Sequence, residues 1–165
     1  MVRIAVLVSG GGTNLQALID AQSRGELKNG RIAAVLSSRP DAYALERAAR
    51  AGIPGYVVAR KDFASNREMT VALVDKLREL NIGLVVLAGF LHILTGEMVA
   101  AFPNAILNVH PALIPSFCGA GYYGLHVHEA ALAYGVKLTG ATVHFVNEEP
   151  DGGPIVLQKA VEVRE

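Results

Sequence analysis

The sequence predicts an α/β protein with a mostly parallel, twisted sheet, helices on both faces and an antiparallel hairpin at its C-terminal end. Short apolar runs alternate with helix-periodic segments along most of the chain, which is the pattern of strand–helix–strand units. The first run stops directly at Ser9-Gly10-Gly11-Gly12, where a strand turns sharply into a helix. Only residues 147–154 separate the last two runs, too few for a parallel crossover.

The charge balance, the length of the apolar runs and the cysteine count limit the classes of protein to which this chain can belong. The chain has 165 residues, with 15 Lys or Arg and 15 Asp or Glu, so its formal net charge is zero. This balance argues against nucleic acid or an acidic membrane surface as a partner. The longest apolar run, residues 82–91, is about half of the roughly 20 residues that a spanning helix needs. The one cysteine, Cys118, suits a reducing compartment. We therefore expect a compact cytoplasmic protein whose residues 1–165 form one domain.

The apolar runs have the length and composition of strands. Most are apolar on both faces, as in a parallel sheet that helices cover, whereas the last two alternate and join through a turn. The predicted strands cover residues 3–8, 31–36, 56–58, 84–87, 105–109, 142–146 and 155–163.

The segments between these runs have the spacing of helices with one buried face. Gly25 and Gly52 end the first two, and Ser65 with Glu68 forms a capping box that opens the third. The predicted helices begin at Asn14, at Pro40-Asp41 and at Ser65, and two shorter ones cover residues 95–101 and 126–134.

Residues 9–14 have the features of a phosphate-binding turn. Glycines let the backbone approach a ligand closely, and the start of the following helix adds partial positive charge. Leu15 stands where a dinucleotide fingerprint has its third glycine, and no lysine follows as in nucleoside-triphosphate loops. The expected ligand is therefore a single phosphate monoester, unless the glycines serve only tight strand–helix packing.

Asn108 and His110 form the second candidate site. Alternate residues of a strand point to one side, so both face one way at the carboxyl end of the fifth strand, where open α/β sheets bind ligands. An amide N–H stabilises a developing oxyanion, and an imidazole moves protons near neutral pH. Taken alone, the pair is also consistent with polar groups that only satisfy backbone hydrogen bonds.

Asp151 lies in the turn between the last two strands, followed by two glycines, which is ordinary hairpin composition. With Glu148 and Glu149 it places three acids within four positions, and repulsion between like charges is expected to raise the pKa of one of them. The alternative is that these acids only solvate the turn.

The remaining polar candidates point to no metal. Cys118, His126 and His128 lack the paired spacing of a structural zinc site. His144 lies inside an alternating strand, where we expect a hydrogen-bonded sheet residue. His92 interrupts the most apolar run, either at the edge of a cleft or as a core histidine.

Taken in order, four segments resemble the phosphoribosylglycinamide formyltransferase family. They are Ser-Gly-Gly-Gly-Thr-Asn-Leu-Gln at 9–16, Leu-Ala-Gly-Phe-Leu-His-Ile-Leu at 87–94, Asn-Val-His-Pro-Ala-Leu-Ile-Pro at 108–115 and Asp-Gly-Gly-Pro-Ile at 151–155. The Asn-x-His-Pro block belongs to the wider formyltransferase superfamily, whereas the glycine loop points to the ribonucleotide enzyme. The resemblance covers essentially the whole chain and implies a formyltransferase-like, Rossmann-type fold.

The resemblance also implies a reaction. Such enzymes transfer a formyl group from N10 of 10-formyltetrahydrofolate to the amino group of glycinamide ribonucleotide in de novo purine (IMP) biosynthesis, through a tetrahedral intermediate and without a metal. The implied catalytic residues are Asn108, His110 and Asp151. The implied contacts to the substrate phosphate are Gly11, Gly12, Thr13 and Asn14. The implied contacts to the folate are Arg67, Leu91, His92, Ile93, Leu94, Asn108, Asn147, Glu148, Glu149, Pro150 and Asp151.

The sequence departs from the family in several places. His92 stands where the family often has Arg, Ala112 where it usually has Ser, and the loop 117–123 is longer than in the shortest members. Family chains also continue with a C-terminal helix, so we expect residues 1–165 to be one formyltransferase catalytic domain without that helix. The alternatives are another enzyme that uses 10-formyltetrahydrofolate, or a phosphate- or nucleotide-binding module without activity. The sequence is compatible with a monomer and with a homodimer.

Overall fold

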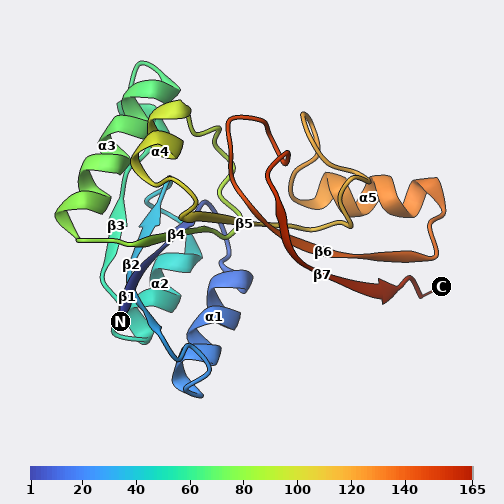
Figure 1. The fold of residues 1–165 in the computed structure, drawn as a ribbon, viewed down its shortest axis with the longest axis horizontal. Helices are drawn as coiled ribbons and strands as arrows, with labels where there is room; N and C mark the ends of the chain where they lie inside the picture. Colours follow the sequence, from blue (N-terminus) through green and yellow to red (C-terminus); the bar gives the residue numbers. More distant parts are fainter. Residues whose placement is uncertain (165) are drawn as a thin grey trace. The chain divides into compact units, whose positions relative to one another are not determined.

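The computed structural model describes residues 1–164 and divides into two compact units, Met1–Ile106 and a second that begins at Leu107. Across the described residues the strand order is β3-β2-β1-β4-β5-β6-β7 (Figure 1). The strands are β1 Val2–Val8, β2 Gly30–Ser37, β3 Gly55–Val57, β4 Leu84–Leu87, β5 Ile106–His110, β6 Leu138–Phe145 and β7 Ile155–Glu162. The helices are α1 Thr13–Ser23, α2 Tyr43–Arg50, the short 3₁₀ helix η1 Arg60–Asp62, α3 Asn66–Glu79, α4 Gly96–Ala101 and α5 Leu125–Tyr134.

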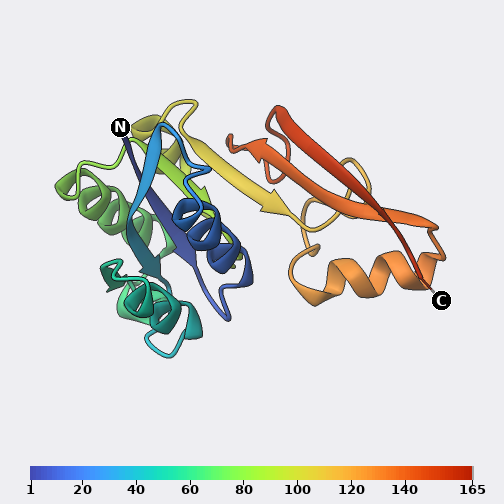
Figure 2. The ribbon, with the colours of Figure 1, turned by 90° about the horizontal axis from the view of Figure 1, so that it is seen from below.

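The first unit contains the parallel part of the sheet. β1 pairs with β2 and β4, β2 pairs with β3, and all of these pairs are parallel. α1 packs beside α2 and α3 beside α4, and Figures 1 and 2 show α1 and α3 on opposite sides of the strands. Helices therefore cover both faces, and β1 is fully buried from Ala5 to Val8. The predicted parallel sheet between two helical layers is confirmed.

The second unit contains the antiparallel part. β6 pairs with β5 on one side and β7 on the other, antiparallel to both, which confirms the predicted C-terminal hairpin. β6 begins at Leu138 rather than at the predicted Thr142, because residues 138–141 pair with residues 159–162 of β7. Gly140 weakens the strand pattern in the sequence there, so the pairing partner decides where the strand starts.

Helix starts follow the predicted capping chemistry with two differences. The hydroxyl of Ser65 accepts a hydrogen bond from the Glu68 N–H (3.1 Å), as the capping box predicts. The Glu68 carboxylate accepts from the N–H of Ala64 (3.1 Å) instead of from Ser65. α2 begins at Tyr43, after Asp41, whose carboxylate pairs with a neighbouring guanidinium. Among residues 1–164, no helix has both the length and the apolar character needed to cross a bilayer.

Candidate active site

Two neighbouring strands of the second unit place polar side chains next to each other. Asn108 and His110 alternate on β5, and the antiparallel register sets them opposite His144 and Thr142 of β6. The Nδ2 atom of Asn108 lies 3.1 Å from Nε2 of His144. His110, Thr142 and His144 are buried. Charges and hydrogen bonds at this site therefore act more strongly than they would in water.

Asp151 reaches the same cluster from the turn between β6 and β7. It has a left-handed backbone (φ 55°), and at Gly153 any side chain would overlap the backbone of β6. This tight turn places the Asp151 carboxylate 3.6 Å from Nδ1 of His110 and 3.5 Å from Nε2 of His144. The structure thus gathers Asn108, His110 and Asp151 in one cluster, with His144 touching both Asn108 and Asp151.

The protonation of the cluster differs from what the acidic turn suggested. Burial raises the pKa of Asp151, but hydrogen bonds from His144 and from the Gly119 N–H, with the positive charge of the histidines, outweigh it and lower the pKa overall. The expected rise through repulsion between acids is therefore wrong for Asp151, because its carboxylate contacts donors and cations. Burial lowers the pKa of His144, but Asp151 and the Phe145 carbonyl outweigh it and raise that pKa. The pair favours a carboxylate beside an imidazolium.

The proton on His144 controls its contact with Asn108. Nδ1–H of His144 donates to the Phe145 carbonyl (2.9 Å), so Nε2 of the neutral ring accepts from the Asn108 amide. A proton on Nε2 turns that atom into a donor, which then serves the Asp151 carboxylate. The orientation of the Asn108 amide is therefore coupled to the titration of its neighbour.

His110 has a protein partner at each ring nitrogen. Nε2 donates to the carbonyl of Phe117 (2.7 Å), and Nδ1 faces Asp151. The N–H of Gly119 donates to the same carboxylate (2.9 Å). The loop after β5 thus contacts both the imidazole and the carboxylate. A ligand that contacts the His110 ring directly must replace one of these partners.

Sequence reasoning missed Thr142 and assigned His144 only to the sheet. His144 is a hydrogen-bonded sheet residue, as predicted, but it also contacts the site residues. The Thr142 hydroxyl accepts from the Ile114 N–H (3.1 Å) and donates to the Ala112 carbonyl (2.7 Å), which holds the segment that follows β5. The available signal was the alternation of Thr142 and His144 on one strand face. Which residues they face depends on the pairing of β5 with β6.

In the first unit, the predicted phosphate loop leads from β1 into α1. Gly12 has a left-handed backbone (φ 73°) and packs against α2, where a Cβ on Gly12 would lie 2.6 Å from the Ala44 Cβ. Within the described chain no side chain caps the start of α1, and its first turn has no acid, so its positive end is open to an anion. The exposed residues of the loop and first turn are Gly10, Gly11, Thr13 and Asn14.

Ser9, at the end of the first unit's central strand, connects this loop to the predicted folate segment. Its buried hydroxyl lies 2.7 Å from the Ser38 hydroxyl and accepts a hydrogen bond from the Leu91 N–H (3.0 Å). The Ser9 hydroxyl therefore links the segments that follow β1, β2 and β4 by hydrogen bonds. Beyond it, Leu91 and Ile93 are 55% and 70% exposed, which leaves two large apolar side chains free to contact a ligand.

Two other predicted folate contacts have partners within the first unit. Arg67 forms an ion pair with Glu97, and hydrogen bonds from Thr95 and Arg67 lower the pKa of Glu97 to about 2. Burial, together with the charge of Arg60, lowers the pKa of His92. A neutral His92 attracts a carboxylate less strongly than the arginine that the family often has there.

The predicted folate contacts at 147–150 lie in the turn before Asp151. These residues are exposed, and the Asn147 side-chain oxygen accepts from the Glu149 N–H (3.0 Å), which shapes the turn. Among residues 1–164, no three His, Cys, Asp or Glu side chains gather in a way that could hold a metal ion.

Residues 2–165 match the formyl transferase family. The chain belongs to this family. It is 48% identical over 163 residues to phosphoribosylglycinamide formyltransferase of Haemophilus influenzae. The aligned region covers 99% of this chain and 74% of that protein. The Escherichia coli protein of the same name is 41% identical over 98% of the chain and 74% of its own length. The human trifunctional purine biosynthetic protein adenosine-3 is 44% identical over 98% of the chain, which corresponds to 15% of that protein.

Solved structures confirm the fold of this formyltransferase. Glycinamide ribonucleotide transformylase 1 from Symbiobacterium toebii matches with a TM-score of 0.93 and 47% identity, over 100% of this chain and 75% of that one. Phosphoribosylglycinamide formyltransferase from Bacillus halodurans matches with a TM-score of 0.90 and 36% identity, over 99% of this chain and 81% of that one. The predicted formyltransferase-like, Rossmann-type fold and the family resemblance are both confirmed, and the protein is an enzyme with small-molecule substrates.

Proposed function

We propose that this formyltransferase transfers a formyl group from 10-formyltetrahydrofolate to the amino group of glycinamide ribonucleotide, a step of de novo purine (IMP) biosynthesis. Relatives that carry the name of this activity match nearly the whole chain. Phosphoribosylglycinamide formyltransferases use 10-formyltetrahydrofolate as the formyl donor. The observation that carries the proposal is the Asp151 carboxylate in contact with two imidazoles, one of which also contacts the amide of Asn108.

The donor set suits attack on a formyl group. When the substrate amine adds to the formyl carbon, the formyl oxygen gains negative charge in a tetrahedral intermediate. The Asn108 amide and a protonated imidazole are the donors that this oxygen needs, and loss of one such donor costs about 3 kcal/mol in comparable sites. The histidines are buried and Asn108 is half-buried, so few water molecules compete for the oxyanion and each interaction is stronger than in water.

The same cluster suits the proton movements. The attacking nitrogen must lose a proton, and N10 of the folate must gain one before the carbon–nitrogen bond breaks. Asp151 keeps a proton on His144 and contacts His110, so the cluster holds an exchangeable proton beside a base. We propose Asn108, His110 and Asp151 as the catalytic residues, with the proton passing between the substrate nitrogens through Asp151 and water.

Substrate binding follows from the exposed segments. The open start of α1 suits the phosphate of the ribonucleotide, which the N–H groups near Gly12, Thr13 and Asn14 would bind, with Gly11 beside them. The exposed apolar side chains after β4 suit the flat ring of the folate. The proposed folate contacts remain Arg67, Leu91, His92, Ile93, Leu94, Asn108, Asn147, Glu148, Glu149, Pro150 and Asp151.

A direct assay tests the proposal. Formyl transfer from 10-formyltetrahydrofolate to glycinamide ribonucleotide is followed with the full 165-residue chain and with Asp151→Asn and His110→Ala. We expect turnover by the unsubstituted protein and a fall in kcat of about 10²- to 10⁴-fold in each variant. Saturable binding of both ligands without turnover would instead support a binding module.

The proposal also covers the domain organisation, the compartment and the oligomeric state of the enzyme. We propose that residues 1–165 act as one catalytic domain, in the cytoplasm, as a monomer or homodimer. Light scattering at the concentration of the assay distinguishes the two oligomeric states.

A further inference from the structure

We propose that Arg47 is a positioning residue that turns the N–H groups of the glycine loop toward the substrate phosphate. The inference rests on the proposed function, since it assumes that this loop binds a phosphate monoester. Arg47 lies on α2, far along the sequence from the loop, and none of the sequence patterns singled it out.

The loop has little support of its own. A side chain built at Gly10 or Gly11 would meet nothing within 4 Å, so no packing holds the backbone on that side. Its hold comes from α2, where the Ala44 N–H donates to the Gly10 carbonyl (3.1 Å) and Nε of Arg47 donates to the Gly11 carbonyl (2.7 Å). Ala44 and Arg47 are three residues apart in α2, so their side chains share the helix face that lies against Gly12.

The two hydrogen bonds to the loop carbonyls also determine the direction of the loop N–H groups. In a planar trans peptide, the carbonyl of one residue and the N–H of the next point in opposite directions. Because the carbonyls of Gly10 and Gly11 point to α2, the N–H groups of Gly11 and Gly12 point away from it. Successive N–H groups that point the same way form an anion-binding nest. Arg47 holds the second of these two peptides.

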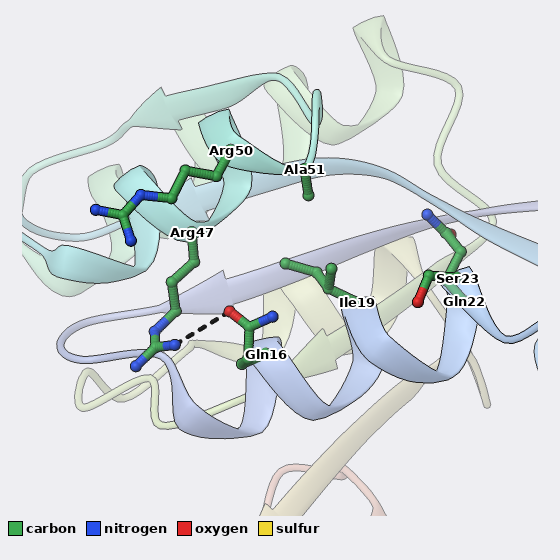
Figure 3. Close-up of a pocket in the computed structure, with 7 residues that line it drawn as sticks. All are labelled: Gln16, Ile19, Gln22, Ser23, Arg47, Arg50 and Ala51. Atoms are coloured by element: carbon green, nitrogen blue, oxygen red, sulfur yellow. Dashed lines mark hydrogen bonds between the residues drawn. The ribbon is translucent and has the colours of Figure 1, made fainter.

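The guanidinium is itself held in place. Its centre lies 4.9 Å from the centroid of the Tyr43 ring, and Nη1 donates to the side-chain oxygen of Gln16 (3.1 Å), on the first turns of α1. Figure 3 shows this bond at one end of a pocket of about 380 Å³ between α1 and α2. Arg47 therefore connects α2, the loop and α1 through one rigid group.

Arg47 also adds a positive charge that has no ion-pair partner among the described residues. Among residues 1–164, no carboxylate forms an ion pair with Arg47, whereas Arg50 on the same helix pairs with Glu46 at 3.4 Å. The positive charge of Arg47 lies beside the loop and adds to the positive end of α1. Both effects favour an anion, and Arg50 offers a control that shares the pocket but not the loop.

The test compares Arg47→Met with Arg50→Met, using glycinamide ribonucleotide and the same glycinamide riboside without its phosphate. We expect Arg47→Met to raise KM for the phosphorylated substrate about tenfold, as loss of a charge-assisted hydrogen bond does. Its kcat, its KM for the folate and its kcat/KM for the riboside stay within about twofold, and Arg50→Met stays within about twofold throughout. If Arg47→Met does not fold, Arg47→Lys retains the charge without the planar fork and is expected to raise KM about threefold.

The outcomes separate the two proposals. An unsubstituted enzyme that uses the riboside as well as the ribonucleotide has no phosphate site, and the proposed role of the loop fails. An enzyme that prefers the ribonucleotide, and keeps that preference in Arg47→Met, overturns the inference about Arg47 alone. Equal losses with both substrates would show that Arg47 serves only the stability of the fold, and would also overturn it.

Discussion

The carboxylate of Asp151 lies 3.5 Å from Nε2 of His144, the ring nitrogen that also meets the Asn108 amide. The acid therefore contacts two imidazoles, because its other oxygen faces His110 at 3.6 Å. One side chain from a turn thus contacts imidazoles on two neighbouring strands. The properties expected of the enzyme follow from this contact and from the glycine loop of the first unit.

Asp151→Asn should impair chemistry more than binding. The amide keeps the size of the side chain but cannot hold a proton or stabilise an imidazolium, so we expect kcat to fall about 10²- to 10⁴-fold. KM for both substrates should change less than about threefold, because the group acts on proton movement. Steady-state kinetics with each substrate varied in turn measure both constants. An equal loss of folate affinity would show that Asp151 only shapes the turn.

The His144–Asp151 pair should make stability depend on pH. The pKa of His144 is raised in the folded protein, so its contribution is complete below the ordinary value of about 6.5 and is lost as pH rises through the raised pKa. The pKa of Asp151 is lowered, so its contribution is present above the ordinary value of about 3.9 and is lost as pH falls through the lowered pKa. Stability from this pair is therefore greatest between about pH 4 and 6.5.

Urea unfolding at several pH values, at constant ionic strength, tests this dependence. The free energy of unfolding of the unsubstituted protein should decline above about pH 6.5, and Asp151→Asn should flatten that decline. His128→Gln, which removes an exposed histidine of α5 outside the cluster, serves as the control and should leave the curve unchanged. A curve that keeps its slope in Asp151→Asn would contradict the assignment.

Ser9→Ala should weaken folate binding more than Ser38→Ala does. Replacing Ser9 leaves the Leu91 N–H without its acceptor at the start of the proposed folate segment, at a cost of about 1–3 kcal/mol in stability. Replacing Ser38 removes only the contact between the two hydroxyls and leaves the Leu91 bond in place. We expect KM for the folate to rise about threefold to tenfold in the first variant and less than about twofold in the second. Similar values for both variants would count against this coupling.

Gly11→Ala is a cleaner probe of the phosphate loop than a substitution at Gly12. At Gly12 a β-branched residue would adopt a left-handed backbone and press against Ala44, which costs stability of about 1–3 kcal/mol whatever the ligand. At Gly11 the added methyl group meets nothing, so the free energy of unfolding should change by less than about 0.5 kcal/mol. We expect this variant to raise KM for the ribonucleotide and not for its riboside. Thermal unfolding of Gly11→Ala and of a variant with a β-branched residue at Gly12 measures the two predicted changes in stability.

Local patterns in the sequence were sufficient for most elements. The strand that ends in glycines, the Ser65 cap of α3 and the alternation of Asn108 with His110 all depend on residues close together in the chain, and the structure retains each of them. Helix and strand boundaries moved where a partner intervened, as at Leu138, where pairing with β7 extends β6 beyond its apolar pattern.

The sequence by itself determined the alternating architecture, the open glycine loop and the shared face of two polar residues, because periodicity and backbone freedom are local properties. Only the tertiary structure decided that His144 lies opposite Asn108, that Arg47 holds the Gly11 carbonyl, and that the pKa of Asp151 falls although two acids closely precede it in the chain. These facts depend on strand register and on contacts between residues far apart in the chain. Charge and hydrogen bonding act through space, so neighbours in sequence do not reveal which groups they reach.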